Sequence, residues 1–596
     1  MSIQSKHFLN TPESLVLDSL QGLVTQNPHL SLDAQNKVVY LTSRDRSKVA
    51  LICGGGSGHE PAHAGFVGKG ILAAAVCGNV FASPNPSQVK RGIELVENDK
   101  GLSLSVIIIV KNYTGDVLNF GLAKEQYAAQ HPEKADRARF LIVGDDVAVS
   151  KSQGKIVGRR GLAGTVLVYK IAGALAERGG SLDQVYNVAD WVSKNVATIG
   201  VGLEHCHVPG TAATQSHLSD SEIEIGMGIH NEPGNRRLSP VPPLGELVKQ
   251  LLENVMSTTD TERSFVPFKG KGDRVVLLVN NLGGMSELEL GGLVGEATKG
   301  LQKRGATVER VIAGTFMTSL NMPGFSLTVL LLPDGQAGAP TATEILELLD
   351  DTPNAPGWKW SAGSTPGQPS EEATTRNQAA TTEGTLKIKA EDPKAFISAV
   401  QRACEALVKE EPEITRMDNI AGDGDCGLTL KDGAQAVLRE VEAGRISGDD
   451  IVGSLIAISR VAEEQMGGTS GALYSIFFAA LAQGFQLNNP NHSTQANLNL
   501  WTASLTSALT KLYTYTRARP PSRTLVDPLD AFITTVSDKK DLVVAIQAAA
   551  DAALQTRDLE AKAGRSAYVE GDRLRTERVP DPGAWGVRTI LDAFRV

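Results

Sequence analysis

The chain has 596 residues, of which 58 are Lys or Arg and 67 are Asp or Glu, so its formal charge is −9. This mild acidity argues against a general binder of nucleic acids or anionic membranes, because both partners are densely negative. Hydrophobic residues make up 41% of the sequence, and the length exceeds what one core usually supports, so we expect two or three globular domains.

Five cysteines at scattered positions do not form a disulfide framework, and no Cys-x-x-Cys pair indicates a structural zinc site. The first residues, MSIQSKHFLN, lack the basic start and apolar core of a signal peptide. No apolar run approaches the roughly 20 residues of a membrane span. The final FRV is not a peroxisomal signal. We therefore expect a cytoplasmic protein.

Residues 1–345 alternate short β-branched runs with longer helical patterns, which is typical of an α/β domain. The strands expected in the first half of this region are 48–53, 71–77, 105–110 and 139–143. The elements expected in the second half are strands 222–229, 274–279, 307–313 and 326–332 and an amphipathic helix over 244–255. The two sets predict one α/β domain with two lobes.

Residues 346–386 are expected to form a flexible linker, because Pro, Gly, Ser, Thr and Ala dominate from 351 to 384. A flexible chain of about 35 residues has an r.m.s. span near ~30 Å. After the linker, strand signals nearly vanish. The helical patterns there cover 396–409, 432–443, 448–464, 472–485, 495–516 and 542–561. Residues 387–596 should therefore form an all-helical domain.

A glycine-rich segment, GGGSGHEP (54–61), follows the first of these strands and precedes an expected helix. Its bare main-chain amides allow a small polar ligand to approach closely. It is not a Walker A loop, and His59 occupies the position where a dinucleotide fingerprint needs its third glycine. A tight strand-to-helix turn capped by Ser57 is the structural alternative.

Two further apolar runs lead into polar side chains. The strand at 105–110 is followed by Lys111 and Asp116, and the run at 222–229 is followed by His230. Ligands of open α/β sheets bind at the carboxyl ends of strands, so these residues are candidates for one site. The charges also fit a solvated turn, and a lone histidine also fits a structural residue.

An acidic cluster lies within the helical region, where Asp418, Asp423 and Asp425 fall within eight positions. Such crowding is unfavourable unless a cation neutralises it. An EF-hand is excluded because the twelfth position of the loop is Ala434. Hard oxygen ligands with few protein donors suit Mg²⁺, and an exposed acidic turn is the alternative.

A second glycine-rich segment, GGTSG (467–471), stands at the start of a strongly apolar helix, where free amides and the helix dipole favour a phosphate. A helix cap would explain Ser470 but would not require three glycines. The segment KAGRSAY, with Lys562 and Arg565, and the turn DPGA (581–584) add a cation and a rigid turn.

Taken in order, the segments GGGSGHEP, KNYTGD, GIHNEPG, D-x4-D-x-D, GGTSG, KAGRSAY and DPGA closely resemble the single-chain, ATP-dependent dihydroxyacetone kinases. Each segment is ordinary alone, but seven in one order across two domains are highly specific. The resemblance covers both domains and leaves out essentially only the linker. It implies a ketose-binding K domain in the first part and a helical-barrel L domain that binds Mg-ATP in the second.

The resemblance implies that His230 attacks the C2 carbonyl of dihydroxyacetone and holds the substrate as a covalent hemiaminal. Glycerol has no carbonyl and should be rejected. Asp116 would take the proton from the attacking hydroxyl, and His59 and Lys111 would assist by hydrogen bonding and charge. The residues implied to position the substrate hydroxyls are Gly56, Ser57 and Gly58.

In the second domain the resemblance implies two Mg²⁺ ions, held by the three aspartates, that bridge the triphosphate. The implied nucleotide contacts are Cys426, Gly427, Leu428, Thr429, Thr469, Ser470, Leu525, Arg565, Asp581, Pro582 and Gly583. Two places depart from the pattern of bacterial phosphotransfer-dependent relatives: Cys426 stands where they often carry His, and the segment 515–529 lacks their glycines.

The resemblance thus implies a dihydroxyacetone and glyceraldehyde kinase that uses free ATP, forms a homodimer and serves triose, methanol or glycerol metabolism. One alternative is a lyase that cyclises FAD to release AMP at the same Mg²⁺ site. The other is a ligand-dependent regulatory protein, which the presence of all three aspartates disfavours.

Overall fold

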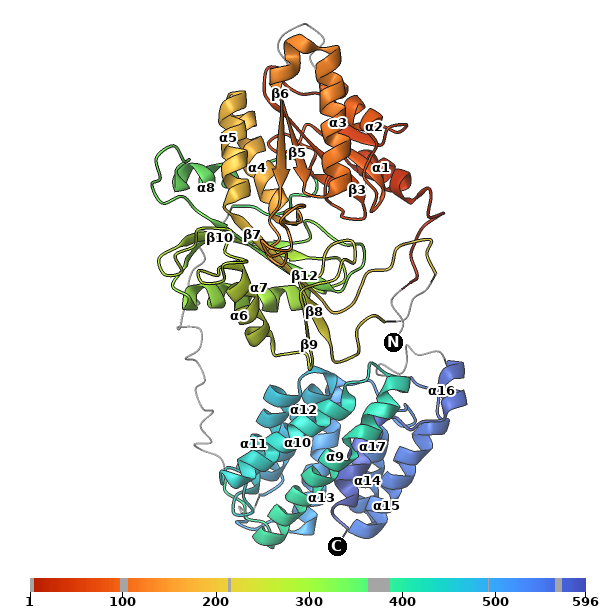
Figure 1. Ribbon diagram of the computed structural model, residues 1–596. Coiled ribbons are helices and arrows are strands. Elements are labelled where there is room, and N and C mark those ends of the chain that lie inside the picture. Colours follow the sequence, from red (N-terminus) through yellow and green to blue (C-terminus); the bar gives the residue numbers. More distant parts are fainter. Residues whose placement is uncertain are drawn as a thin grey trace. The chain divides into compact units, whose positions relative to one another are not determined.

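The computed structural model describes residues 5–96, 105–212, 216–362, 386–490, 493–562 and 571–595. The chain divides into two compact units, Met1–Ser370 and Glu371–Val596 (Figure 1). All five cysteines are free thiols. None of the described helices has the length and apolar character needed to cross a membrane.

The first sheet of the first unit has the strand order β1-β2-β4-β3-β5-β6. Its strands are β1 (Leu30–Asp33), β2 (Val38–Leu41), β3 (Ala50–Ser57), β4 (Ala74–Val80), β5 (Val106–Lys111) and β6 (Ala138–Val143). Strands β3 to β6 run parallel, and β1 and β2 extend the sheet antiparallel. The central strands are buried on both faces, which explains their continuous apolar runs.

Helices lie on both sides of this sheet (Figure 1), and alternate residues of its central strands belong to two different cores. Ile108 belongs to a core that includes residues of α2 (Pro86–Val96) and α3 (Thr114–Gln130). Ile107 belongs to a core that includes residues of α4 and α5. The helices on that side are α1 (Leu15–Gln26), α4 (Gly164–Glu177) and α5 (Leu182–Lys194).

The second sheet has the order β11-β10-β12-β7-β8-β9, in which only β10 and β11 pair in parallel. Its strands are β7 (Val196–Gly202), β8 (Ile223–Ile225), β9 (Arg236–Leu238), β10 (Arg274–Asn281), β11 (Thr307–Gly314) and β12 (Gly324–Leu331). Its core includes buried residues of α6 (Leu244–Val255) and α7 (Glu287–Lys303). The two sheets confirm the two-lobed α/β fold expected from the sequence.

Two local predictions in this unit are wrong. The strand expected over 222–229 ends at Ile225, because Gly226 has a φ of +82° and turns the chain out of the sheet. No helix directly follows the glycine-rich segment, since β3 continues through Ser57 and only a short 3₁₀ helix forms at Ala64–Phe66. The pattern also did not predict β1, β2, β7 and β9.

The first unit extends beyond its expected end at residue 345. Helix α8 (Ala342–Asp350) crosses the expected boundary, and Trp358 is buried in the main core of the unit. The indole nitrogen of Trp360 donates a hydrogen bond to a β11 carbonyl at 2.9 Å. The linker expected to begin at 346 therefore starts too early, because the two tryptophans fix this Pro- and Gly-rich segment. Residues 363–385 lie outside the described part of the chain.

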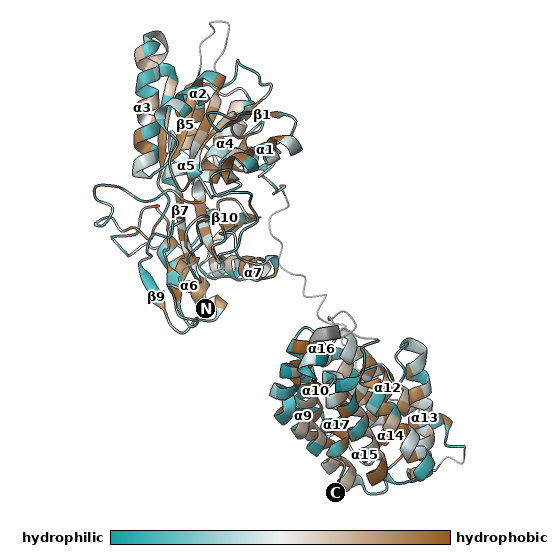
Figure 2. Ribbon diagram, turned by 90° about the vertical axis from the view of Figure 1, so that its right-hand side faces the viewer, coloured by the Kyte–Doolittle hydropathy of each residue, from teal (hydrophilic) through white to brown (hydrophobic). Residues whose placement is uncertain are grey.

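In the second unit, the described residues form helices and no named strand, which confirms the all-helical prediction. The helices are α9 (Pro393–Ala421), α10 (Cys426–Glu442), α11 (Ile451–Val461), α12 (Gly468–Leu487), α13 (Leu498–Tyr515), α14 (Val526–Lys539), α15 (Leu542–Gln555), α16 (Gly571–Glu577) and α17 (Pro582–Asp592). They carry both hydrophilic and hydrophobic residues along their lengths (Figure 2). Helices α14, α16 and α17 were not predicted.

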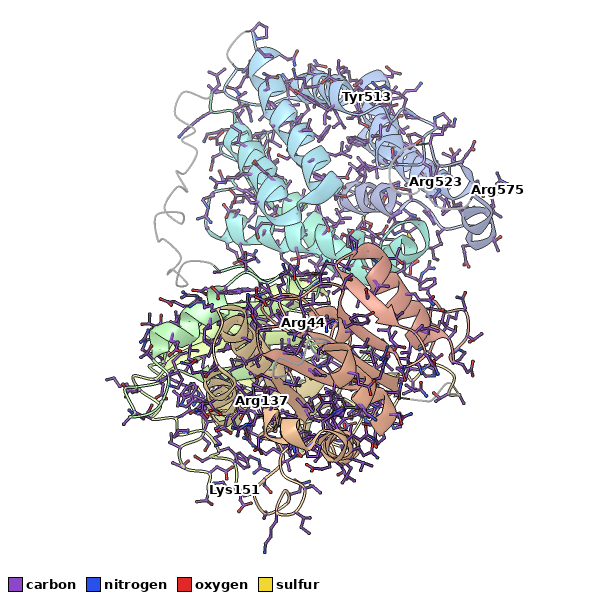
Figure 3. All side chains as sticks on the ribbon, turned by 90° about the horizontal axis from the view of Figure 1, so that it is seen from above. Arg44, Arg137, Lys151, Tyr513, Arg523 and Arg575 are labelled. Carbon is purple, nitrogen blue, oxygen red and sulfur yellow. The ribbon has the colours of Figure 1, made fainter. Side chains whose placement is uncertain are left out.

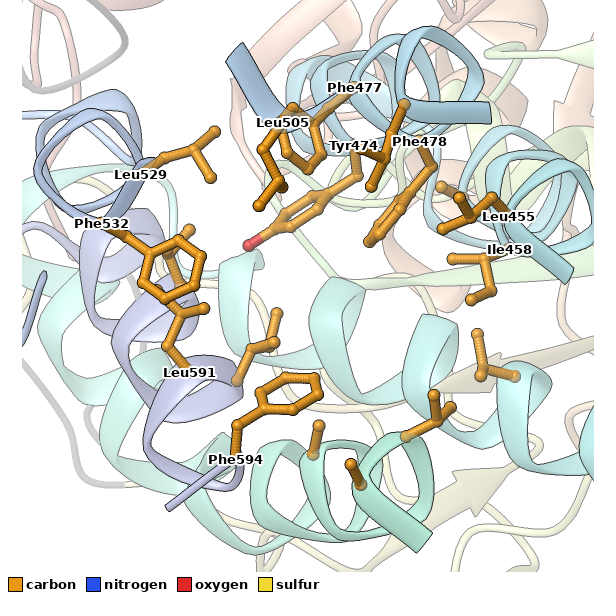
Figure 4. Close-up of a pocket in the computed structure, with 18 of the residues that line it drawn as sticks. Leu455, Ile458, Tyr474, Phe477, Phe478, Leu505, Leu529, Phe532, Leu591 and Phe594 are labelled. Atoms are coloured by element: carbon orange, nitrogen blue, oxygen red, sulfur yellow. The ribbon is translucent and has the colours of Figure 1, made fainter. Parts of the chain in front are cut away.

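The helices of this unit surround an apolar cavity of about 470 Å³ (Figure 4). Its lining is almost entirely aliphatic and aromatic, with Phe477, Phe532 and Phe594 among the larger side chains. The hydroxyl group of Tyr474 points into it. A triphosphate needs cations and hydrogen-bond donors, which the lining of this cavity lacks. We therefore expect a phosphate site at the polar ends of the helices and not in the cavity.

Candidate active site

In the first unit, the imidazole of His230 lies among other rings. Its Nε2 atom is 3.0 Å from Nε2 of His59. The ring centroids of Phe81 and Tyr113 lie 5.0 Å and 4.6 Å from that of His230, and both rings are nearly perpendicular to it. These residues follow β8, β3, β4 and β5, so segments far apart in the sequence converge beyond the strand ends, as the sequence predicted.

Glu232 orients His230. One carboxylate oxygen lies 2.9 Å from Nδ1 of His230, and the other accepts the main-chain N–H of His230 at 2.8 Å. Burial alone would raise the pKa of Glu232, but the hydrogen bonds and charge of His230 outweigh burial and lower that pKa to about 2. An ionised carboxylate on Nδ1 keeps the proton there and leaves a lone pair on Nε2.

The imidazole of His59 faces the lone pair on Nε2 of His230. Its Nδ1 atom donates to the carbonyl oxygen of Thr318 at 2.8 Å, so its Nε2 atom also carries a lone pair in the neutral ring. A proton between the two Nε2 atoms would relieve this contact. Burial, followed by the charges of Lys111 and His230, lowers the pKa of His59 well below its ordinary value. Such a proton is readily given up.

Lys111 and Asp116 supply an amine and a carboxyl group beside these rings. Lys111 ends β5 with its side chain fully buried, and its Nζ atom lies 5.3 Å from the ring centroid of Tyr113 without a hydrogen-bond partner among the described residues. Asp116 lies in the first turn of α3 and is 5% exposed. Burial lowers the pKa of Lys111 and raises that of Asp116, while the charge of each opposes the shift of the other. Desolvated groups of this kind suit proton exchange with a substrate.

The glycine-rich end of β3 brings bare main chain up to this cluster. Gly55 has a φ of +150°, and a Cβ atom there would lie 3.2 Å from a carboxylate oxygen of Asp116. A Cβ atom on Gly56 would lie 2.7 Å from the main-chain nitrogen of Ala82. The hydroxyl of Ser57 donates to the carbonyl of Gly78 at 2.9 Å. Ser57 therefore joins two strands and does not cap a helix.

Sequence reasoning assigned no role to four residues of this cluster. Glu232 and Tyr113 lie inside the motifs GIHNEPG and KNYTGD, so each could have been identified from its position beside a candidate residue. Phe81 and Thr318 belong to segments that carry no chemical motif, and only the tertiary structure brings them to the histidines.

In the second unit, Asp418, Asp423 and Asp425 come together. Each offers a carboxylate oxygen, and these oxygens lie within 4.8 Å of one another. No other group of three potential metal ligands of this kind was found in the described part of the chain. Asp418 is buried, whereas Asp423 and Asp425 are exposed. Hard oxygen ligands with one solvent-facing side fit Mg²⁺, which retains waters and shares its shell with phosphates.

The turn between α9 and α10 fixes the buried member of the trio. One carboxylate oxygen of Asp418 accepts the main-chain N–H groups of Gly424 and Cys426, each at 3.0 Å. Gly424 has a φ of +87°, and a Cβ atom on Gly427 would lie 2.2 Å from the hydroxyl oxygen of Thr415. The glycines therefore allow a tight approach that holds the carboxylates in place.

Several predicted nucleotide contacts lie beside the trio. Burial, followed by the charges of Asp418 and Asp581, raises the pKa of the Cys426 thiol. Asp581 caps α17 by accepting the N–H of Ala584 at 2.9 Å, and burial raises its pKa to about 6. A Cβ atom on Gly583 would lie 3.4 Å from Cβ of Leu525. DPGA is thus the start of a helix, as Pro582 at its first position allows.

The remaining predicted contacts occupy other helix starts. Gly427, Leu428 and Thr429 form the first turn of α10, and Thr469 and Ser470 lie in the first turn of α12. One turn further along α12, the hydroxyl oxygen of Tyr474 lies 3.8 Å from a Cβ built on Gly586 of α17. Arg565 lies outside the described residues.

Comparisons with known proteins agree with this division into units. Residues 21–357 match the model of the Dak1 domain, and residues 420–596 match that of the DAK2 domain. The chain is 41% identical over 613 aligned residues to a dihydroxyacetone kinase of Komagataella pastoris, covering 99% of this chain and 98% of the relative. It is 37% identical over 602 residues to the triokinase/FMN cyclase of Homo sapiens, covering 99% of each.

A solved structure resembles both units. It is the dihydroxyacetone kinase of C. freundii in complex with AMP-PNP and Mg²⁺. The TM-score is 0.61 at 29% sequence identity, and the match covers 99% of each chain. A relative about 40% identical matches nearly the whole chain, and the two domain models match one unit each. The chain therefore belongs to the family of single-chain dihydroxyacetone kinases that combine a Dak1 domain with a DAK2 domain.

Proposed function

We propose that this protein is an ATP-dependent dihydroxyacetone kinase that also phosphorylates glyceraldehyde. The observation that carries the proposal is the imidazole of His230, which is oriented by an ionised carboxylate and faces a second, buried imidazole through Nε2. Such a nitrogen is a nucleophile suited to a carbonyl carbon. Relatives named dihydroxyacetone kinase match the chain over nearly its whole length, which supports the same activity.

Ketose capture follows from these groups. The Nε2 lone pair of His230 forms a bond to C2 of dihydroxyacetone, and the π electrons of the carbonyl move to its oxygen. A proton taken up from solvent through Nε2 of His59 moves to that oxygen, which completes a neutral hydroxyl group. Glu232 balances the positive charge left on the His230 ring. Asp116 then accepts the proton of the terminal hydroxyl as the hydroxyl oxygen bonds to the γ-phosphorus and the bond from that phosphorus to the bridging oxygen breaks, so that ADP leaves. Lys111 supports the charge that develops.

The second unit would hold the phosphoryl donor. The carboxylates of Asp418, Asp423 and Asp425 suit two Mg²⁺ ions bound together with ATP, and these ions would neutralise charge on the transferring phosphoryl group. The main-chain N–H groups at the start of α10 and α12 would bind phosphate oxygens, assisted by the hydroxyls of Thr469 and Ser470. The relative from C. freundii solved with AMP-PNP and Mg²⁺ supports this assignment.

Substrate choice tests the proposed function. Because capture needs a carbonyl carbon, kcat/KM for dihydroxyacetone should exceed that for glycerol by at least about 10³-fold. A coupled assay of ADP release with each acceptor measures the ratio. Glyceraldehyde serves as the positive control, since its aldehyde can form the same adduct. Equal rates with glycerol and dihydroxyacetone would contradict covalent selection by His230.

Substituting Glu232→Gln should lower kcat/KM for dihydroxyacetone by about 10²-fold. A glutamine amide can donate to Nδ1 of His230, which favours the tautomer with its proton on Nε2 and removes the nucleophilic lone pair. The KM for ATP should not change. Glu222→Gln is the matched control, because this side chain is only half-buried and, among the described residues, its carboxylate accepts a hydrogen bond from Ser219 and from no residue that contacts His230. Unchanged turnover in Glu232→Gln would show that the tautomer does not matter.

A second activity is the cyclising release of AMP from FAD at the same Mg²⁺ site. The match to a human protein named triokinase/FMN cyclase favours it. Incubation with FAD and Mn²⁺ or Mg²⁺, without any ketose, should yield cyclic FMN if the activity is present. We further propose that the protein acts as a homodimer in the cytoplasm, which sedimentation equilibrium and cell fractionation can check.

A further inference from the structure

Arg523 is an unusual buried charge in the second unit. It is 1% exposed and lies in the loop before α14 with a φ of +59° (Figure 3). One terminal nitrogen donates to the carbonyl oxygen of Val579 at 2.9 Å. The other, Nη1, lies 3.9 Å from a carboxylate oxygen of Asp581. Within the described residues, Nη1 and Nε have no hydrogen-bond partner. Burying a guanidinium with two unused donors is costly, so stability alone does not explain it.

The loop that carries Arg523 is held firmly at both sides of that residue. The main-chain N–H groups of Ser522 and Thr524 donate to the carboxylate of Asp527 at 2.9 Å and 2.8 Å. The carbonyl oxygen of Ser522 accepts the main-chain N–H of Lys562 at 3.2 Å. The direction of the Arg523 side chain is therefore set by the backbone on either side of it.

The same loop touches the segments assigned to the nucleotide. Leu525 packs against Gly583 in the first turn of α17, and Lys562 opens the segment KAGRSAY. Arg523 contacts Val579 and approaches Asp581, which caps α17. The guanidinium is buried, so it reaches the nucleotide only through these neighbours.

We propose that Arg523 is a positioning residue for ATP: it fixes the chain from Val579 to Gly583 so that the start of α17 presents its polar groups to the nucleotide. This inference rests on the proposed kinase function. The gap of 3.9 Å between Nη1 and Asp581 is longer than a hydrogen bond. Binding of ATP closes it, and the two unused donors then gain a carboxylate partner.

The test compares variants of the full-length enzyme. Arg523→Met removes the charge and the N–H donors but keeps much of the side-chain volume. Arg523→Lys keeps the charge but replaces the planar guanidinium and its several donors by a single ammonium group. Arg445→Met is the matched control, because Arg445 is exposed and pairs with Glu440. For each variant, kcat and KM are measured with ATP and with dihydroxyacetone, and the melting temperature is measured with and without MgATP.

Arg523→Met should raise the KM for ATP by about 10- to 100-fold, with kcat and the KM for dihydroxyacetone within about threefold of the parent values. The rise in melting temperature caused by MgATP should shrink in parallel, because a ligand stabilises only in proportion to its binding. Arg523→Lys should recover part of the lost affinity. Arg445→Met should behave as the parent enzyme in every one of these measurements.

A folded Arg523→Met enzyme with the parental KM for ATP would overturn the proposal, as would equal losses for ATP and dihydroxyacetone. If Arg523→Met does not fold, Arg523→Gln decides by the same criteria, since its amide can still donate to the carbonyl of Val579. Failure of the proposed function looks different: the unmodified enzyme itself would then not phosphorylate dihydroxyacetone.

Discussion

His230→Ala should lower kcat/KM for dihydroxyacetone by about 10⁴-fold or more, because it removes the nitrogen that we propose captures the ketose and fixes it for phosphoryl transfer. The ring is at the site surface, with its side chain 20% exposed, so its loss should not unfold the first unit. ATP binding should persist, since every predicted nucleotide contact belongs to the second unit. Steady-state kinetics and a calorimetric titration with MgATP measure both effects.

His131→Ala is the matched control for this substitution. His131 follows the last turn of α3, whereas Asp116 lies in the first turn of the same helix. Its ring contacts that of Tyr127 with centroids 4.7 Å apart, at the opposite end of α3 from Asp116. Parental kinetics are expected for this variant. Substantial ketose kinase activity in His230→Ala would mean that another group captures the substrate.

The double substitution Asp423→Asn with Asp425→Asn should lower kcat/KM for ATP by about 10³-fold or more, since the loss of metal-borne charge stabilisation is worth several kcal/mol. Folding should not suffer, because both side chains are exposed and crowd a third carboxylate. Removing two like charges should leave the melting temperature without Mg²⁺ unchanged or slightly higher. Scanning calorimetry with and without MgATP separates these effects.

Asp432→Asn is the control for this pair, because Asp432 is an exposed carboxylate on α10 outside the cluster. It should retain the parental dependence on Mg²⁺. A double variant that kept the parental rate and Mg²⁺ dependence would show that the trio does not hold the ions. Loss of both the kinase and any FAD-cyclising activity is expected if the two reactions share this site.

The sequence predicts the location of the candidate residues of the first unit where strand ends supply them. The run VIIIVK forms β5, and Lys111 and Asp116 follow it as expected, because parallel strands direct their carboxyl ends to one edge. His230 reaches the same place by another route. Its strand stops at Ile225, and a positive φ at Gly226 is a backbone property that an apolar pattern does not reveal.

What the sequence missed depends on contacts between distant segments. Phe81 and Thr318 meet His59 only in the folded chain, so neither shows a local signal. Similarly, Pro and Gly in DPGA predict a turn. In the structure Asp581 is the N-cap of α17 and Pro582 is its first residue. The sequence places the start of the linker too early, because composition alone does not reveal that Trp358 is buried and that Trp360 is hydrogen-bonded.

Covalent capture is tested most directly by the ¹³C NMR spectrum of dihydroxyacetone labelled at C2 and bound to the full-length protein. The carbonyl resonance should be lost on binding and replaced by that of a tetrahedral carbon attached to nitrogen, and His230→Ala should abolish the change. Bound substrate that keeps its carbonyl resonance would contradict covalent capture by His230.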